Sequence, residues 1–446
     1  MDLSGKRVLA VLIKWKYDFF TGLENLEKPA DSGLIGVFSR QLQPKIGVLH
    51  LKHFDEVVWF ETSYNSYKAT ENYWNFDEIQ IPGLKEVVEE LVKKYGATKL
   101  RLLAGEETTI HAVCELRGIF GIPGATPHAI THIRNKAEMK EWASRHGIAV
   151  AKDYLLNVFP NLSVEKSIAE IESKLSYPLF AKPVQASCGL GTAKLLDRTS
   201  LTNWLSETKT SARTFAKQEF IIEEFYDEPE FWVSTILLQN GQFKINHLLY
   251  MPYKTSQESI KSGKPMCFLS ESAENAERMV PGATEFAKKV INSFKPPGPY
   301  VLGMEGFEVN GKLLLRELAY RVFGQRGTGN TYYRSGTSLE TAFIRTHLDP
   351  DYQAIPDPEM SGIFVADIWY PRVAGRLRSK KPFDMTTITS VFKIRWFVDV
   401  GERMSKSQAM NENMCYVTLF NSHPEECRND ATYVYETFMP DVDDCC

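Results

Sequence analysis

Residues 303–317 constrain the fold of this chain more than any other segment, because they show two strand-like runs joined at Asn310 and Gly311. An Asn-Gly pair between such runs is a strong local signal for a β-hairpin. Consecutive leucines at 313–315 predict that the second strand is central and buried in its sheet. A carboxylate on a buried strand needs a partner. The segment therefore predicts an antiparallel pair of strands that carries a polar site.

The register of this hairpin decides where Glu305 and Glu317 point. A two-residue loop would pair Glu305 with Arg316 and place the two glutamates on opposite faces. A three-residue loop, with Gly311 left-handed, pairs Glu305 with Leu315 and makes the glutamates diagonal neighbours, roughly 7 to 8 Å apart on one face. We expect the three-residue loop, since two carboxylates on one face can hold one or two Mg²⁺ ions. On an edge hairpin the same glutamates would face solvent.

A second segment combines a strand that ends in lysine with a run of small residues at 186–191. Lys182 lies in the apolar strand 177–183, and the run that follows contains Ser187, Cys188, Gly189 and Gly191. Small residues let backbone N–H groups approach a polyphosphate, and a lysine adds a point charge. The run lacks the Walker sequence GxxxxGK[ST]. A phosphate-binding loop and a plain glycine-containing hairpin turn explain this segment equally well.

A third segment, residues 220–230, is an apolar strand that runs into a cluster of acidic residues. Such a cluster is usually the solvated edge of a sheet. In the functional interpretation it is a hinge, in which the Glu223 side chain or carbonyl accepts from an adenine amino group. The backbone N–H groups that follow would then donate to the ring.

Asn135 and Glu138 resemble the start of a helix, with Lys136 in its first turn. A cation there opposes the helix dipole, so it is either solvated or compensated by an anion from elsewhere. Taken alone, the pattern favours a solvated lysine.

The chain divides into three parts by pattern. Residues 1–125 alternate buried strands with helical periods, which predicts an α/β domain that ends near the Gly-Ile-Pro-Gly sequence at 121–124. Residues 126–350 contain the three segments described above. Residues 351–446 alternate β-rich runs with turns and close on a helix, for which residues 422–425 form a capping box. This last part looks like a small α+β cap.

Composition excludes several classes of protein. The 446 residues carry 52 basic and 56 acidic side chains, a balance of −4, so a globally basic nucleic-acid binder is not expected. The aliphatic run at 8–13 is far shorter than the roughly 20 residues that cross a bilayer. The seven cysteines show no CxxC spacing and read as reduced thiols. We therefore expect a cytoplasmic protein without a membrane contact, and a frayed tail at Cys445 and Cys446 in preference to a lipid anchor.

The order of these segments resembles the ATP-grasp superfamily, in which a lysine at a helix start precedes a Lys-Pro strand, a small-residue loop, a Glu-Glu hinge and a hairpin with paired glutamates and an arginine. The resemblance covers most of the chain. It implies a mixed α/β and α+β fold with an N-terminal Rossmann-like domain (1–125). An ATP-grasp central region (126–350) would include a mobile lid at about 150–222, and a strand-rich C-terminal cap (351–446) would complete the ATP-grasp domain.

The resemblance also implies a nucleotide site. Lys136 and Lys182 would contact the phosphates of ATP, and Ser187, Cys188, Gly189 and Gly191 would belong to the mobile glycine loop. Glu223, Glu224 and Phe225 would form the adenine hinge, and Glu230 would contact the ribose.

In the same way, the resemblance implies that Glu305 and Glu317 bind Mg²⁺, with Mn²⁺ as an alternative. Many members place an asparagine two residues after the second glutamate, as a further metal ligand, whereas this chain has Ala319. A Glu-Leu-Ala-x-Arg run is similar to that of the L-amino-acid (dipeptide) ligase and carnosine-synthase-like group, in which two glutamates suffice. Arg321 would steady the oxyanion of the reaction, and Arg326 would contact a substrate carboxylate.

The implied chemistry is the ATP-dependent joining of a carboxylate to an amine through an acylphosphate, with release of ADP and phosphate. The partners are then small-molecule carboxylates and amines, amino acids among them, and a homodimer would be ordinary for the family. Two alternatives stay open. One is a ligase whose acceptor is not an amino acid, and the other is an ATP-binding interaction module of the synapsin kind that turns over little.

Overall fold

The structure is a computed structural model, and it describes most of the chain. The described residues are 2–443 apart from 19, 63–80, 160, 187–188, 190, 212–217, 254, 272–276, 323, 325–329, 331, 334–336, 354–362, 408–409 and 411. Ser187, Cys188, Arg326, Cys445 and Cys446 therefore lie outside the described residues.

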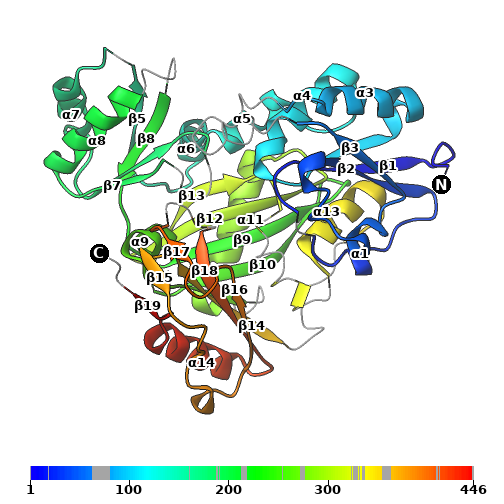
Figure 1. Cartoon of the computed structure of the whole chain (residues 1–446). Coiled ribbons are helices and arrows are strands. Elements are labelled where there is room, and N and C mark those ends of the chain that lie inside the picture. The colour runs from blue at the N-terminus through cyan, green and yellow to red at the C-terminus, as the bar shows by residue number, and fades with distance from the viewer. Residues whose placement is uncertain are drawn as a thin grey trace.

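The N-terminal part is a parallel sheet of four strands with helices packed on it (Figure 1). Its strands are β1 (Val8–Lys14), β2 (Ser32–Ser39), β3 (Glu56–Phe60) and β4 (Leu100–Ala104), in the order β3-β2-β1-β4. Every residue of β1 and β2 is buried, as both faces of a parallel sheet require. Helices α3 (Leu84–Tyr95) and α4 (Ile110–Phe120) follow β3 and β4 in the chain. The predicted strand-helix alternation of this part is present.

A small second unit lies apart from the rest of the molecule and has its own apolar core (Figure 1). Its antiparallel sheet has the order β5-β8-β6-β7, and helices α7 and α8 cover it. The bounds are β5 (Asp153–Val158), α7 (Val164–Glu172), β6 (Leu179–Pro183), β7 (Ala193–Leu195), α8 (Arg198–Ser211) and β8 (Gln218–Glu224). This unit corresponds in position to the expected lid, and we call it the lid.

The largest element is an antiparallel sheet of eight strands in the order β13-β12-β9-β10-β11-β14-β18-β16. Its strands are β9 (Glu230–Leu237), β10 (Phe243–Met251), β11 (Met266–Glu271), β12 (Tyr300–Val309), β13 (Lys312–Ala319), β14 (Phe364–Pro371), β16 (Val391–Trp396) and β18 (Asn413–Asn421). The C-terminal part thus adds β14, β16 and β18 to the central sheet and is not a separate layer. Apolar side chains of β9, β10, β12 and β13 share one continuous core with the N-terminal sheet, whereas most of those of β14 and β18 pack with α14 in a second core.

The remaining helices complete the fold. They are α5 (Pro127–Arg134), α6 (Lys136–Arg145), α9 (Ser256–Ser262), α11 (Ala283–Phe294), α13 (Leu339–Leu348) and α14 (Pro424–Thr437). A small sheet of β15 (Gly375–Leu377), β17 (Arg403–Met404) and β19 (Val442–Asp443) lies beside α14 near the C-terminus (Figure 1). The remaining pieces are single turns: α1 (Val48–Leu51), η1 (Leu23–Asn25), η2 (Arg40–Leu42), η4 (Ala97–Lys99), η5 (Glu107–Thr109) and η6 (Met385–Thr387).

One of the two predicted helix starts has the expected cap. The Asn135 side-chain oxygen accepts from the backbone N–H groups of Ala137 and Glu138, at 3.0 and 3.2 Å, which fixes the start of α6. The helix predicted to start at 422–425 is present as α14, but its capping box is wrong: the N-cap residue is His423, whose side chain makes no capping hydrogen bond. A proline at the first helical position needs no cap for its own nitrogen.

The turn of the β12–β13 hairpin corrects the three-residue loop that we expected. Val309 pairs with Lys312, so the loop has two residues. Asn310 and Gly311 have φ values of 52° and 72°. Positive φ at both loop positions defines a type I′ turn, whose twist matches that of the strands it joins.

A β-bulge then changes the register of the hairpin. Because of it, the two-residue loop does not place Glu305 and Glu317 on opposite faces. Gly306 pairs with Leu315, but the next pair is Glu305 with Glu317, so Arg316 is an extra residue on β13. Without the bulge, Glu305 would face Arg316. The glutamates therefore share a face, as predicted. They are direct partners and not diagonal neighbours, and the cause is the bulge and not a three-residue loop.

The prediction that this strand is central is also wrong. β13 is the terminal strand of the eight-stranded sheet. Its outer edge is covered, since the Leu315 N–H donates to the Ala149 carbonyl oxygen at 2.8 Å and helices α5 and α6 pack against β13. Apolar residues at 313–315 thus reflect a covered edge and not a central position.

No helix in the part of the chain that the structure describes is long and apolar enough to cross a membrane.

Gly306 provides a test of the bulged hairpin. A Cβ there would overlap the Phe231 ring and lie 2.8 Å from the Leu314 carbonyl oxygen. We expect Gly306→Ala to lower the free energy of unfolding by about 2 kcal/mol, because the backbone must shift. In the control, Gly47→Ala, nothing lies within 4 Å of the new Cβ, and the change should stay within about 0.5 kcal/mol. Chemical denaturation measures the free energy of unfolding of both variants. Equal values for the two would contradict the register of the bulged hairpin.

Candidate functional site

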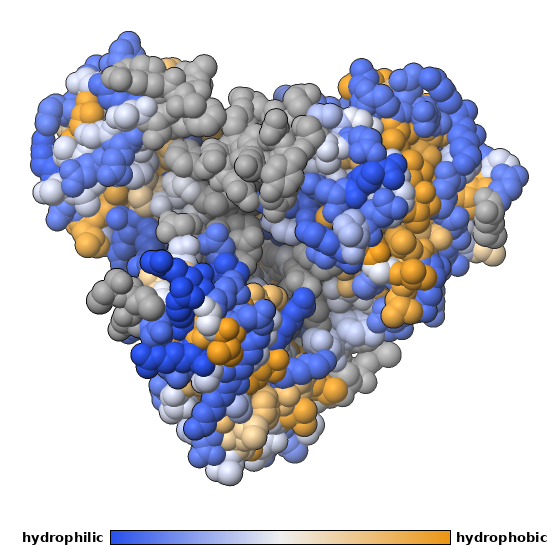
Figure 2. All heavy atoms as spheres, viewed as in Figure 1, coloured by the Kyte–Doolittle hydropathy of each residue, from blue (hydrophilic) through white to orange (hydrophobic). Residues whose placement is uncertain are grey.

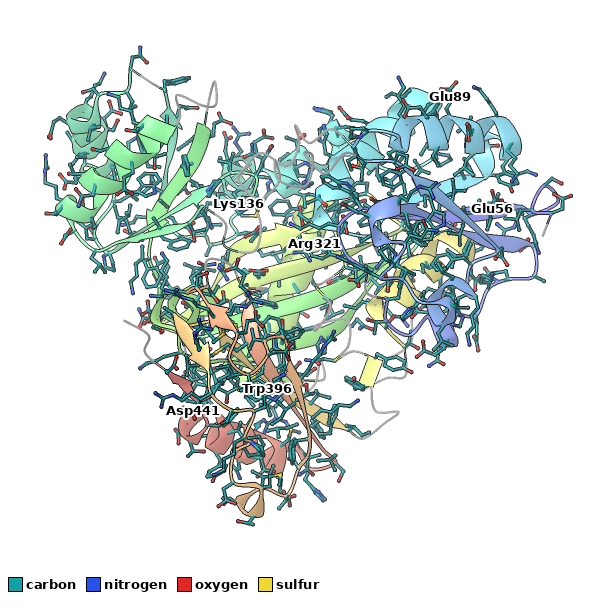
Figure 3. All side chains as sticks on the ribbon, in the orientation of Figure 1. Glu56, Glu89, Lys136, Arg321, Trp396 and Asp441 are labelled. Carbon is teal, nitrogen blue, oxygen red and sulfur yellow. The ribbon has the colours of Figure 1, made fainter. Side chains whose placement is uncertain are left out.

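The site lies where the lid, the N-terminal part and the central sheet meet. Lys136 and Arg321, which belong to two of the sequence segments, lie near the middle of the molecule (Figure 3). In the space-filling view the described residues form three lobes around this region (Figure 2). The described residues of the site come from α6, β6, β8, β9, β12 and β13.

The paired glutamates each contact a cation. Glu317 Oε1 lies 3.1 Å from Lys136 Nζ, which also donates to the Ala186 carbonyl oxygen at 2.6 Å. Lys136 is buried, so the expectation of a solvated lysine is wrong. Its charge at the start of α6 is compensated by an anion from β13, the alternative left open by the sequence.

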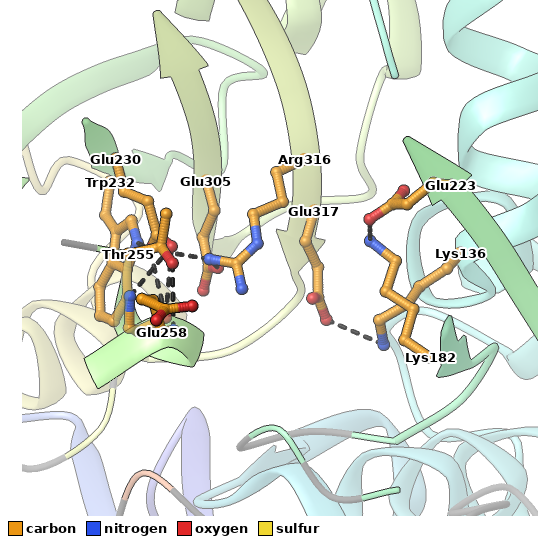
Figure 4. A network of polar contacts seen from close by, with 11 residues as sticks. Lys136, Lys182, Glu223, Glu230, Trp232, Thr255, Glu258, Glu305, Arg316 and Glu317 are labelled. Carbon is orange, nitrogen blue, oxygen red and sulfur yellow. Dashed lines mark hydrogen bonds and ion pairs between the residues drawn. The ribbon is translucent and has the colours of Figure 1, made fainter. Parts of the chain in front are cut away.

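Arg316 provides the cation next to Glu305. Its Nη1 lies 2.8 Å from Glu230 Oε2 and 3.3 Å from Glu305 Oε2. Arg316 and Glu317 both project from β13 into the site, the guanidinium toward Glu305 and Glu230 and the carboxylate toward Lys136 (Figure 4). The sequence analysis did not assign Arg316 to the site.

Burial raises the pKa of Glu305 to about 7, against the opposing effect of Arg316 and with the help of the nearby Glu317 and Glu230 carboxylates. A bound cation would favour the ionised form of such a group. Among the described residues, no three His, Cys, Asp or Glu side chains form a metal cluster by themselves.

Two lysines hold Glu223. Its Oε1 lies 2.7 Å from Lys182 Nζ, and its Oε2 lies 2.6 Å from Lys140 Nζ. All three side chains are buried. Burial alone would raise the pKa of Glu223, but Lys140 and Lys182 lower it to about 2. Burial lowers the pKa of Lys182, which Glu223 partly offsets.

Lys140 was missed by the sequence analysis. It follows Lys136 by one helical turn on α6, so the two side chains leave the same face of the helix. The four-residue spacing of the two lysines is the sequence signal that could have predicted that Lys140 belongs to the site. The Glu223 side chain is engaged by two lysines, which leaves its carbonyl as the acceptor in the hinge interpretation.

The small-residue loop is described in part. Gly189 and Gly191 have φ values of 76° and 70°, a conformation that favours glycine. Thr192 Oγ1 donates to the Gly189 carbonyl oxygen at 2.8 Å and to Gln257 Oε1 of α9 at 3.1 Å. Lys194 Nζ lies 2.8 Å from Glu258 Oε2, so the lid is tied to α9 at two points.

The hinge segment lines an open pocket. The lining residues are Phe180, Glu223, Glu224, Phe225, Tyr226, Glu230, Thr255, Gln257, Phe307 and Arg316. The N–H groups of Glu224 and Phe225 donate to the carbonyl oxygens of Lys152 and Pro178, at 3.1 and 3.0 Å. A backbone donor to a ligand in this pocket would therefore have to come from a later residue than Phe225.

Glu230 is completely buried, and its carboxylate is engaged within the protein. Besides Arg316, the Ser256 N–H donates to Oε1 at 3.2 Å and Trp232 Nε1 donates to Oε2 at 3.4 Å. Its first role in this structure is to fix Arg316.

Arg321 reaches the N-terminal part. Its Nε donates to Glu107 Oε2 at 2.6 Å, and Arg134 Nη2 lies 3.2 Å from Glu107 Oε1. Burial would raise the pKa of Glu107, but the two arginines lower it. Glu107 thus connects the segment that follows β13 to the N-terminal domain.

Comparisons with known proteins find relatives for parts of the sequence and for the fold. No family model matches the chain. A segment of 96 residues is 33% identical to the alpha-aminoadipate–LysW ligase LysX of Sulfurisphaera tokodaii, over 22% of this chain and 31% of that protein. A segment of 125 residues is 34% identical to the D-alanine–D-alanine ligase of Ruminiclostridium cellulolyticum, over 26% of this chain and 31% of that protein. The chain thus spans under a third of the length of these relatives.

Solved structures resemble the chain over nearly its whole length. An L-amino acid ligase from Bacillus licheniformis superposes with a TM-score of 0.70 at 13% identity, over 98% of this chain and 100% of that one. An ADP complex of N5-carboxyaminoimidazole ribonucleotide synthetase has a TM-score of 0.61 at 14% identity, over 97% of both chains. These likenesses confirm the fold that the sequence predicted.

Glu223 gives the site a measurable pH dependence. Its pKa is lowered in the folded protein, so its stabilising effect is complete above its unfolded pKa of about 4.3 and is lost as the pH falls toward 2. We expect Glu223→Gln to remove roughly 3 kcal/mol from the acid-dependent change in unfolding free energy. The measurement is urea denaturation between pH 2 and 7.

The matched control is Glu165→Gln, since the Glu165 side chain is 78% exposed on the same lid. This variant should keep the wild-type acid profile. An unchanged profile in Glu223→Gln would contradict the buried Lys140–Glu223–Lys182 arrangement.

Proposed function

We propose, from the premise that this chain has the ATP-grasp fold, that it is an ATP-dependent carboxylate–amine ligase that acts on small molecules of the amino-acid class. The observation that carries the proposal is the meeting of Glu305, Glu317 and Lys136 from two separate segments, with Lys136 Nζ 3.1 Å from Glu317 Oε1. The names of the relatives and of the structural neighbours, which are ligases and a synthetase, support it.

In this proposal the nucleotide lies between the lid and the central sheet. The adenine occupies the pocket beside the hinge residues Glu224 and Phe225, with the Glu223 carbonyl as acceptor. Lys136 and Lys182 turn from their carboxylate partners to the phosphates, and the loop at Gly189 and Gly191 covers them. Glu230 acts on the ribose side of the pocket, which it lines.

The carboxylates of Glu305 and Glu317 fit a divalent cation. They are direct partners across the bulged hairpin, Glu317 contacts Lys136 of α6, and carboxylate oxygens suit Mg²⁺ or Mn²⁺. Such an ion would neutralise charge on the phosphates during transfer. Lys136 holds Glu317 in place until the nucleotide arrives, because the buried ammonium would otherwise lack an anionic partner.

The reaction has two steps. A substrate carboxylate oxygen attacks the γ-phosphorus of ATP, the bond to the β-phosphate bridging oxygen breaks, and ADP leaves. The amine nitrogen then attacks the carbonyl carbon of the acylphosphate, a proton passes to solvent, and phosphate leaves as the amide forms. No protein nucleophile is needed, so the side chains act by position and charge.

We propose that Arg321 stabilises the oxyanion that forms when the amine attacks the acylphosphate in the second step. Glu107 holds the Arg321 guanidinium by one oxygen, while Arg134 holds the other, so Glu107 keeps a cationic partner when Arg321 turns to a ligand. Arg326, outside the described residues, would contact a substrate carboxylate. These two arginines complete the assignment of the catalytic groups.

Glu317→Gln tests the carboxylate pair. The substitution removes the charge that a divalent ion needs, and we expect ATP-dependent turnover to fall by at least about 100-fold, or about 2.7 kcal/mol. The matched control is Glu308→Gln on the same hairpin, since Glu308 lies on the opposite face of β12 from Glu305. Near-normal turnover in Glu317→Gln would remove the metal assignment.

The substrate class is tested by a pooled amino-acid screen that reads phosphate release, with mass spectrometry of the product. We expect release only when a carboxylate and an amine are both present, together with a product whose mass is their sum less water. If the acceptor is not an amino acid, phosphate release should instead be stimulated by a pool of acceptors that are not amino acids. Nucleotide binding with no acceptor-stimulated release would favour the interaction-module alternative and overturn the ligase proposal.

A further inference from the structure

We propose that the Arg316 guanidinium takes the place of one divalent ion beside Glu305, so that the nucleotide complex of this protein holds one divalent ion and not two. The inference rests on the proposed function, since it concerns the same nucleotide site. It goes further because it assigns a number of ions and gives a role to a residue that the ligase proposal does not use.

The bulge explains why Arg316 reaches the site at all. In a regular strand, neighbouring side chains point to opposite faces. Where Glu305 pairs with Glu317 and Gly306 with Leu315, Arg316 is the inserted residue, and a bulge turns two successive side chains toward one side. Arg316 and Glu317 consequently project into the same space (Figure 4).

Arg316 is fixed in this position by Glu230. Glu230 is fully buried, and the Arg316 side chain, only 11% exposed, brings its Nη1 to 2.8 Å from Glu230 Oε2. The other donors to Glu230, the Ser256 N–H and Trp232 Nε1, are neutral. If Arg316 moved away, Glu230 would be a buried carboxylate without its cation. Arg316 therefore stays when a nucleotide binds, unlike a lysine whose partner can be exchanged.

The fixed guanidinium occupies the approach to Glu305. Its Nη1 lies 3.3 Å from Glu305 Oε2, so a divalent ion on that oxygen would lie beside the guanidinium, and like charges that close repel strongly in a buried site. On the other side, Ala319 offers no ligand two residues after Glu317. One ion can bind to Glu317 and the remaining oxygen of Glu305, and Arg316 supplies the second positive charge.

The test counts ions in the full-length protein. Mn²⁺ bound per bound AMP-PNP is measured by equilibrium dialysis, with free Mn²⁺ read by electron paramagnetic resonance. We expect one Mn²⁺ per nucleotide in the wild type and in Arg316→Lys, which keeps the charge. We expect two in the double variant Arg316→Met with Glu230→Gln, which removes both charges of the buried pair. The amide of the second substitution keeps a polar group on the ribose side of the pocket, so AMP-PNP should still bind.

Two Mn²⁺ per nucleotide in the wild type, or one in the double variant, would overturn the inference and leave the ligase proposal intact. Failure of the wild type to bind AMP-PNP would overturn both. Thermal unfolding of the double variant checks that its count refers to folded protein.

Discussion

The site depends on ion pairs that join different parts of the chain and in which at least one side chain is buried. Glu223 of the lid lies between Lys182 of the lid and Lys140 of α6, and Glu317 of the central sheet contacts Lys136 of the same helix. An unpaired charge in such places is costly, so each pair fixes the relative position of two elements. Helix α6 therefore connects the lid to the central sheet through Lys136 and Lys140.

The N-terminal part is attached by the same kind of interaction. Glu107 follows β4 and holds Arg321 from the end of β13, while Lys14 at the end of β1 lies 2.7 Å from Glu340 of α13. Both contacts come from the carboxyl ends of parallel strands, the edge at which α/β sheets commonly bind ligands. The N-terminal sheet thus forms one wall of the site, and the cost of moving it is the loss of these buried pairs.

A single inserted residue governs the chemistry of the hairpin. With the two-residue turn at Asn310 and Gly311, the glutamates would lie on opposite faces if the strands were regular. The bulge at Arg316 brings Glu305 opposite Glu317 and adds a guanidinium to the same face. The residue that corrects the register is also the one that changes the charge of the proposed metal site.

The sequence by itself determined what depends on local pattern: the strand-helix alternation, the Asn135 cap, the hairpin and the identity of the charged residues. It did not determine the loop length, the edge position of β13 or the partners of Lys136, and it missed Lys140 and Arg316. A bulge and a strand order depend on contacts between residues far apart in the chain, such as Leu315 with Ala149. Only the tertiary structure decides such contacts. The charge state and the partners of an ionisable side chain depend on its burial and on the charges that folding brings near it.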